Sequence, residues 1–269
     1  MTAIAGRISA TAGVFWLWLG LLVALTASSI VLLRSTGVNP TTDFSPVIIL
    51  VAFSPSLAAI IDSVVFGGWH SVKRLLGQIC RWRFALRWYV IALLLPVVVV
   101  GLAHVLFRFA GGKVAGPWLD ISSLAPGFGA IVAGSFGEEI GWRGLLQPLL
   151  QKRLNIFWAS VAVGFIWATW HCWPVLAPGG HEHRWVLDVG LTYLRLVPTA
   201  VLYGWLYNAA GKSLLVVMLA HAAHNIVVDS LPVPDSAYGL TAITAGLYLL
   251  AAIVVTWLAR RQLFASSQE

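Results

Sequence analysis

Charged residues are scarce in this sequence. Only 10% of its 269 residues are charged, whereas 59% are hydrophobic, and an ordinary soluble domain has about 25% charged residues. This scarcity excludes a typical soluble domain. The hydrophobic residues lie in long runs, and about 20 mainly apolar residues are enough for a helix to cross a bilayer. The sequence therefore predicts an all-α, polytopic membrane protein.

Cysteine is scarce as well, since the chain has only Cys80 and Cys172. The two are expected at different depths of the membrane, so we predict no disulfide between them. Cys172 directly follows His171, but neighbouring side chains on a helix point about 100° apart. We therefore expect Cys172 to be a packed thiol and neither a nucleophile nor a metal ligand.

Eight apolar runs are candidate membrane spans, and the breaks between them are too short to hold a second domain. We therefore expect residues 1–269 to form a single integral membrane domain with about eight transmembrane helices. The first run has no clear signal-peptide cleavage site, so we expect it to be retained. The candidate spans are 14–33, 46–66, 88–108, 125–148, 156–176, 185–207, 213–229 and 239–259.

Lys and Arg lie mostly on alternate breaks between these spans, which is the positive-inside pattern. The pattern predicts that the N-terminus and the C-terminus both face the cytoplasm. It also accounts for the net charge of +7, so the charge does not indicate nucleic-acid binding. The basic and aromatic segment 69–88 is expected either to rest on the inner leaflet or to form a charged loop with aromatic anchors for the next span. The compact chain without organelle signals favours a bacterial plasma membrane, and the lipid bilayer is its first predicted partner.

Ionisable and strongly polar residues inside membrane spans are costly and mark function by default. Asp62 and His104 lie near the ends of their spans, where we expect them to reach water. Arg195 lies deeper, and we expect it to pair with an acid or a carbonyl. The complete set is Asp62, His104, Glu138, Glu139, Arg143, His171, Arg195, His221, His224 and Asn225.

Helical spacing divides the roles of the two adjacent acids. Glu139 and Arg143 are four residues apart and are expected to pair on one helix face. Glu138 points about 100° aside and is free to face another helix. His221 and Asn225 share a face in the same way, with His224 at its edge. At about 1.5 Å of rise per residue, these groups and His171 can meet near the middle of the membrane.

Three motifs in this region are similar to those of the CPBP family, which includes the type II CAAX prenyl endopeptidases and bacteriocin-processing intramembrane proteases. "EEIGWR" at 138–143 matches EExxxR, and "HAAHN" at 221–225 matches HxxxN. The family's FxxxH resembles "WATWH" at 167–171, where Trp167 replaces the usual Phe. We expect this exchange to alter packing more than chemistry. The resemblance covers roughly residues 124–228.

The resemblance implies hydrolysis of a peptide bond within the membrane by Glu138, His171, His221 and Asn225, with Glu139, Arg143, His224 and Trp167 in support. Glu138 and His171 would activate water, and the side chains of His221 and Asn225 would stabilise the oxyanion. The expected substrate is a peptide or membrane protein, with or without a lipid attached, that reaches the site from the cytoplasmic side.

Several alternatives stay open. A zinc ion held by Glu138, His171 and His221 would give a metal-dependent version of the same protease, but the chain has no HExxH sequence and Asn is a poor zinc ligand, so we expect no cofactor. Ser135 in "GSFG" resembles a rhomboid nucleophile, although its small neighbours favour close helix packing. A proton-coupled transporter would use similar acids, yet the sequence shows no internal repeat. A non-catalytic immunity protein could keep the motifs and bind a partner.

Overall fold

The computed structural model describes residues 2–40, 45–114, 128–179, 185–231 and 238–265. These residues form helices and contain no strand, which confirms the all-α prediction. The helices are α1 (Thr2–Thr36), α2 (Pro46–Leu76), α3 (Leu86–Phe109), α4 (Phe128–Glu139), the π-helix η2 (Ile140–Leu146), α5 (Gln147–Leu150), α6 (Ile156–Trp170), the 3-10 helix η3 (Trp173–Leu176), α7 (Trp185–Ala209), α8 (Leu214–Ser230), α9 (Tyr238–Leu258) and α10 (Arg260–Leu263).

Six helical segments of the described chain are long and apolar enough to cross a membrane. They comprise α1, α2, α3, α6 together with η3, α7 and α9. Helix α8 is apolar but has only 17 residues. The predicted span 125–148 begins outside the described residues, and its described part is divided among α4, η2 and α5. The protein is a multi-pass membrane protein, while the count of eight spans and their orientation stay predictions.

Helix α2 is divided by a kink close to the predicted end of its span at residue 66. The helical residues run from Pro46 to Leu76, but the kink lies at Gly68, whose backbone has φ +58° and ψ −165°. A positive φ favours glycine, so the chain can turn here without a side chain in a strained position. The first part of the expected interfacial segment 69–88 therefore extends α2, and Trp69 is 72% exposed.

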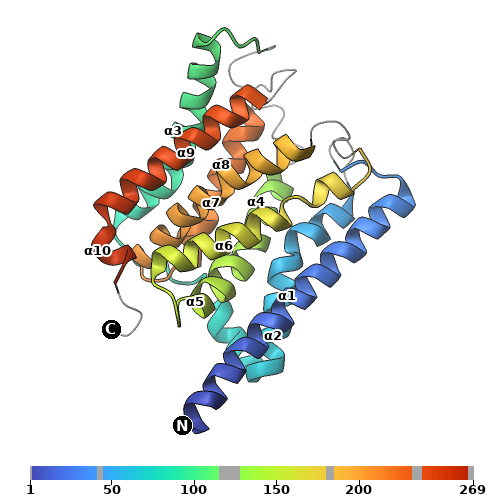
Figure 1. Ribbon diagram of the computed structural model, residues 1–269, viewed down its shortest axis with the longest axis vertical. Coiled ribbons are helices and arrows are strands. Elements are labelled where there is room, and N and C mark those ends of the chain that lie inside the picture. The colour runs from blue at the N-terminus through green and yellow to red at the C-terminus, as the bar shows by residue number, and fades with distance from the viewer. Residues whose placement is uncertain (1, 41–44, 115–127, 180–184, 232–237, 266–269) are drawn as a thin grey trace.

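Helix α4 lies at the centre of the bundle (Figure 1). It packs against α2 on one side and against α8 on the other. Helix α1 runs along α2, α6 packs along α7, and α3 contacts both α8 and α9. The two motif-bearing helices that follow α4 in the sequence, α6 and α8, are thereby placed around its C-terminal end.

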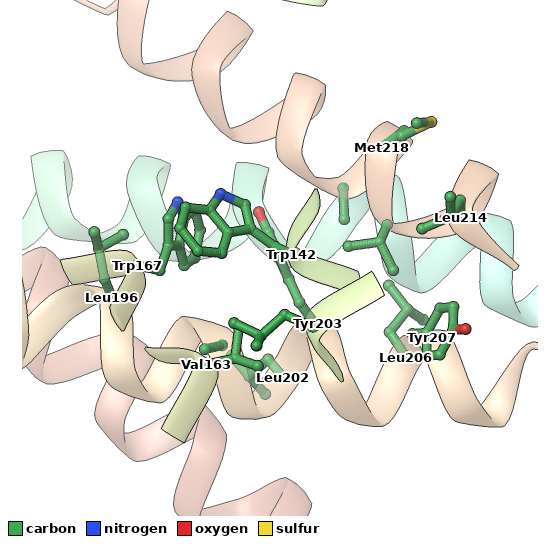
Figure 2. Packing of buried hydrophobic residues seen from close by; sticks show 14 of the residues in the cluster. Trp142, Val163, Trp167, Leu196, Leu202, Tyr203, Leu206, Tyr207, Leu214 and Met218 are labelled. Atoms are coloured by element: carbon green, nitrogen blue, oxygen red, sulfur yellow. The ribbon is translucent and has the colours of Figure 1, made fainter. Parts of the chain in front are cut away.

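Polarity is reversed relative to a soluble protein. Large apolar side chains such as Val31 (66%) and Ile253 (56%) are exposed on the outside of the bundle, where lipid would cover them. Several polar side chains are fully buried, and Gln147 Nε2 donates to Ser160 Oγ at 3.0 Å. Buried aliphatic and aromatic side chains also pack together in the interior (Figure 2). Interhelical hydrogen bonds and close packing, which hold membrane helices together, therefore converge in the bundle interior.

The π-helix η2 begins directly after the two adjacent acids. In its last turn the N–H of Gln147 bonds to the carbonyl of Trp142, five residues earlier, which is the π spacing. Gly141 allows η2 to approach α2 closely, since a Cβ at this position would lie 2.4 Å from the carbonyl oxygen of Pro55. The hydroxyl of Ser56 in α2 donates to the carbonyl of Gly137. Short π segments are frequent at functional sites, and here the segment sets the direction of Arg143 relative to Glu139.

Candidate active site

The predicted ion pair between Glu139 and Arg143 is confirmed. Arg143 Nη1 donates to both carboxylate oxygens, at 2.9 Å and 3.1 Å, and neither side chain is exposed to any measurable extent. The guanidinium also lies over the rings of Trp167 at 4.4 Å and Tyr203 at 5.1 Å. Tyr203 is a member of this site that the sequence motifs did not reveal. The aromatic faces help to hold a cation that is removed from water.

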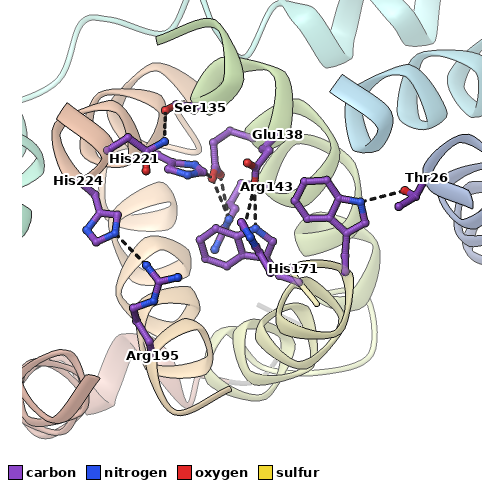
Figure 3. Close-up of polar contacts among 12 residues, drawn as sticks. Thr26, Ser135, Glu138, Arg143, His171, Arg195, His221 and His224 are labelled. Atoms are coloured by element: carbon purple, nitrogen blue, oxygen red, sulfur yellow. Dashed lines mark hydrogen bonds and ion pairs between the residues drawn. The ribbon is translucent and has the colours of Figure 1, made fainter. Parts of the chain in front are cut away.

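His221 makes a second contact to Glu139, because its Nδ1 lies 2.9 Å from Oε1. Helix α8 is thereby joined to the end of α4 through a polar contact (Figure 3). The motif analysis placed His221 in the oxyanion site and did not anticipate a carboxylate partner for it. The contact leaves Nε2 of the imidazole for another function.

Glu138 faces α6 and not Arg143. Its Oε2 accepts a hydrogen bond from the indole Nε1 of Trp167 at 2.8 Å and lies 3.5 Å from Nε2 of His171. The indole N–H binds the candidate catalytic carboxylate, a polar contact that the sequence did not reveal and that a phenyl ring could not make, and the expectation that the exchange alters packing more than chemistry stays a prediction. The structure brings Glu138 and His171 together as predicted.

His171 stands at the C-terminal end of α6 and is the most accessible member of the charged cluster. Its side chain is 27% exposed, against 8% for Glu138. Its ring lies between those of Trp167 at 5.5 Å and Trp170 at 4.9 Å, measured between centroids. Trp170 donates in turn to Thr26 Oγ1 of α1 at 3.0 Å. The accessible edge of the site is therefore at His171, and α1 supports it.

Asn225 is oriented by a residue of α4. Its Nδ2 donates to Ser135 Oγ at 3.0 Å, and Ser135 is completely buried. An amide NH₂ has two donors, so one N–H stays for a ligand. Ser135 thus has a function as an acceptor for Asn225, which the sequence analysis did not foresee when it weighed this residue as a nucleophile.

His224, expected at the edge of the face that carries His221, has its partners on other helices. Its Nδ1 lies 2.8 Å from the hydroxyl of Tyr248 in α9, and its Nε2 lies 3.2 Å from Nη1 of Arg195 in α7 (Figure 3). Residues three apart on a helix are offset by about 60°, and that offset directs His224 to other helices. Arg195 was expected to bind an acid or a carbonyl, and its partner is this histidine instead.

The remaining polar residues that the sequence analysis considered lie outside the cluster. Cys172 Sγ contacts the carbonyl of Ala168 at 3.2 Å, and both cysteines are free, which confirms the packed thiol and the predicted absence of a disulfide. His104 was expected to reach water, but it is buried and its Nδ1 lies 2.9 Å from the carbonyl of Val100. Asp62 is only 1% exposed, although it lines a cavity of about 490 Å³ beside α5.

The donor set does not fit a metal site. Within the described ranges, no three His, Cys, Asp or Glu side chains are grouped so that they could hold one ion. Of the three residues considered as zinc ligands, His221 directs its Nδ1 to Glu139 and not to a point shared with Glu138 and His171. Zinc requires ligand atoms at about 2.0–2.2 Å around a common centre, and this geometry does not supply one.

Part of the chain is similar to known proteins. The family described as "Type II CAAX prenyl endopeptidase Rce1-like" matches residues 120–227. CAAX prenyl protease 2 of Methanococcus maripaludis is 23% identical over 177 residues, which cover 62% of this chain and 64% of that protein. Lysostaphin resistance protein A of Staphylococcus haemolyticus is 27% identical over 139 residues, which cover 49% of this chain and 35% of that protein.

The chain thus spans less than two thirds of the length of either relative. The matched segment nevertheless includes all three motifs, and the structure brings their acids and histidines into one polar cluster. Residues 120–227 thus match the family of Rce1-like type II CAAX prenyl endopeptidases, and the chain is similar to a CAAX prenyl protease over 177 residues.

Proposed function

We propose that this protein is an intramembrane endopeptidase in which Glu138 and His171 activate a water molecule. The observation that carries this proposal is the division between the two adjacent acids. Glu139 is neutralised by Arg143, whereas Glu138 has no arginine partner among the described residues and faces His171 at the accessible edge of the cluster. A carboxylate held in this way is available to accept a proton.

Glu138 would act as the general base. Water between Glu138 and His171 would give a proton to the carboxylate as its oxygen attacks the carbonyl carbon of the peptide. Collapse of the tetrahedral intermediate would then break the C–N bond, and the same proton would pass to the leaving amine. The 3.5 Å separation of Glu138 Oε2 and His171 Nε2 is longer than a strong hydrogen bond, which agrees with a site that tightens only around its substrate.

His221 and Asn225 would stabilise the oxyanion. Asn225 offers its second N–H, because only one donor of the amide is used by Ser135. His221 contacts Glu139 through Nδ1, so it can donate from Nε2 only when both ring nitrogens carry hydrogen. In that form His221, together with Arg143, would balance the charges of Glu138 and Glu139. Such donors act strongly where water is excluded.

The mechanism is proposed to need no metal ion. Its base, its activating histidine and its oxyanion donors are all side chains of this chain, and the donor set does not converge on one point. We propose further that the substrate is a peptide or membrane-protein tail that reaches His171 from the cytoplasmic side of a bacterial plasma membrane. A lipid-modified tail is the first candidate, because one relative is named a CAAX prenyl protease.

The test uses purified protein in liposomes with a panel of fluorogenic tail peptides, each prepared with and without a prenyl group. Wild type is expected to cleave at least one peptide, and Glu138→Gln, His171→Ala and His221→Ala are each expected to lose about 100-fold or more of that activity. Arg153→Gln, a change of an exposed residue, is the matched control. If wild type and the three site variants cleave alike, or wild type cleaves none of the peptides, the protease assignment fails.

A non-catalytic resistance function is the second candidate, because one relative is named a resistance protein. The two candidates separate in cells. Glu138→Gln would abolish a protective effect that depends on hydrolysis, whereas it would leave an effect that depends only on binding of a partner.

A further inference from the structure

Arg195 of α7 is a cation inside a membrane-spanning helix without an acidic partner. Among the described residues, no Asp or Glu oxygen lies within ion-pair distance of its guanidinium, and its Nε is buried without a hydrogen-bond acceptor. Arg143 differs sharply, because Glu139 neutralises it. A charge in this environment is costly unless it is paired. The proposed peptidase mechanism gives no reason for such a charge at Arg195.

The guanidinium of Arg195 is held in place by a histidine of α8. Its Nη1 donates to His224 Nε2 at 3.2 Å, which requires the hydrogen of a neutral His224 to be on Nδ1. That hydrogen can be donated to the hydroxyl of Tyr248, which lies 2.8 Å away. The three residues come from α7, α8 and α9. A guanidinium has five N–H donors and His224 uses only one, so a fixed fork of donors is left for a ligand.

The location of Arg195 connects it to the candidate active site. Its partner His224 is one turn from His221 on α8, so the guanidinium points toward the helix that carries the proposed oxyanion donors (Figure 3). An anionic group bound by Arg195 would therefore belong to a molecule that also occupies the catalytic site.

We propose that Arg195 binds the free C-terminal carboxylate of the peptide substrate, an inference that rests on the proposed peptidase function. The planar fork of a guanidinium matches the two oxygens of a carboxylate, and every unmodified peptide tail ends in that group. The carboxylate of the substrate supplies the missing counter-charge. Because Arg195 and Glu138 are held in place, the distance between them determines which peptide bond near the end of the tail is cleaved. His224 and Tyr248 are positioning residues for the guanidinium.

The experiment compares two forms of the best-cleaved peptide that differ only at the C-terminus, one with a free carboxylate and one with a carboxamide. The quantity measured is the ratio of kcat/KM for the two forms. Wild type is expected to favour the carboxylate by about 10-fold to 100-fold, the usual effect of a hydrogen bond to a charged group. Arg195→Gln is expected to bring the ratio to about one, and Tyr248→Phe to reduce it part of the way.

Arg260→Gln is the matched control, since Arg260 lies in α10 at the end of the chain's helices, and it should keep the wild-type ratio. A wild-type ratio near one overturns the inference and leaves the peptidase assignment intact, and it would direct attention to lipid phosphate as the anion at Arg195. Retention of the wild-type ratio by Arg195→Gln overturns it as well. Cleavage of neither peptide overturns the proposed function and this inference with it.

Discussion

The indole N–H of Trp167 donates to the carboxylate of Glu138 across 2.8 Å. The same indole ring lies against the guanidinium of Arg143, and its centroid is 5.5 Å from those of His171 and His221. Trp167 therefore contacts Glu138, Arg143 and both histidines of the proposed site. It fixes one oxygen of Glu138, so that the carboxylate keeps its direction toward His171.

Replacement of Trp167 by Phe, the residue usual at this position in the family, should reduce kcat about tenfold, because a hydrogen bond to a charged group is lost. KM should change little, since the indole does not lie where substrate is proposed to bind. Peptide cleavage measured over a range of substrate concentrations separates the two constants. Trp18→Phe is a matched control, as this buried indole donates to the carbonyl of Pro55. An unchanged kcat in Trp167→Phe would show that the contact has no catalytic effect.

Glu139→Gln should destabilise the fold, because it leaves Arg143 buried without its counter-charge, at a cost of about 3 kcal/mol or more. The double variant Glu139→Gln, Arg143→Met should recover part of that loss, since it removes the unpaired charge as well. Thermal unfolding in detergent measures both effects. Glu138→Gln is the control and should unfold close to wild type. A double variant whose loss of stability equals the sum of the losses in Glu139→Gln and in Arg143→Met alone would contradict a coupled ion pair.

Asn225→Ala should lower kcat by about 100-fold or more, the usual effect of removing one oxyanion donor. Ser135→Ala should have a smaller effect, because it removes only the group that orients the Asn225 amide. Peptide cleavage at saturating substrate measures both. Complete loss of activity in a folded Ser135→Ala protein would instead revive the serine nucleophile.

Tight metal chelators should leave peptide cleavage unchanged, because the proposed base and oxyanion donors need no ion. Initial rates are measured before a prolonged incubation with chelator and again after the chelator has been removed. A loss of activity that added zinc restores would show a metal-dependent enzyme and would overturn this part of the mechanism.

Local spacing in the sequence was sufficient for part of this site. The Glu139 and Arg143 pair follows from two residues four apart in one chain segment, and the structure contains it. The high cost of polar groups in a membrane also identified the histidines and acids that form the cluster. These conclusions need only a helix and an apolar surrounding, both of which the composition supplies.

Contacts between helices could not be predicted in the same way, because the rotation of each helix about its axis depends on packing. His221 contacts Glu139 and His224 contacts Arg195, although both histidines belong to one short motif. Trp167 was recognised as a substitution for Phe, yet its effect became visible only when α6 was seen beside Glu138. The cue available in the sequence was that an indole carries a donor that a phenyl ring does not.

The π-helix η2 makes the site depend on the number of residues between Glu139 and Gln147. A π-turn holds one residue more than an α-turn, so the segment is equivalent to an α-helix with one residue inserted between Glu139 and Gln147. Deletion of a single residue within 140–146 would restore regular α-helical winding and rotate one end of the segment by about 100° relative to the other. Either the two acids or the anchor at Gln147 would then face the wrong neighbour. The length of this short segment is thus as much a determinant of the site as the identity of its residues.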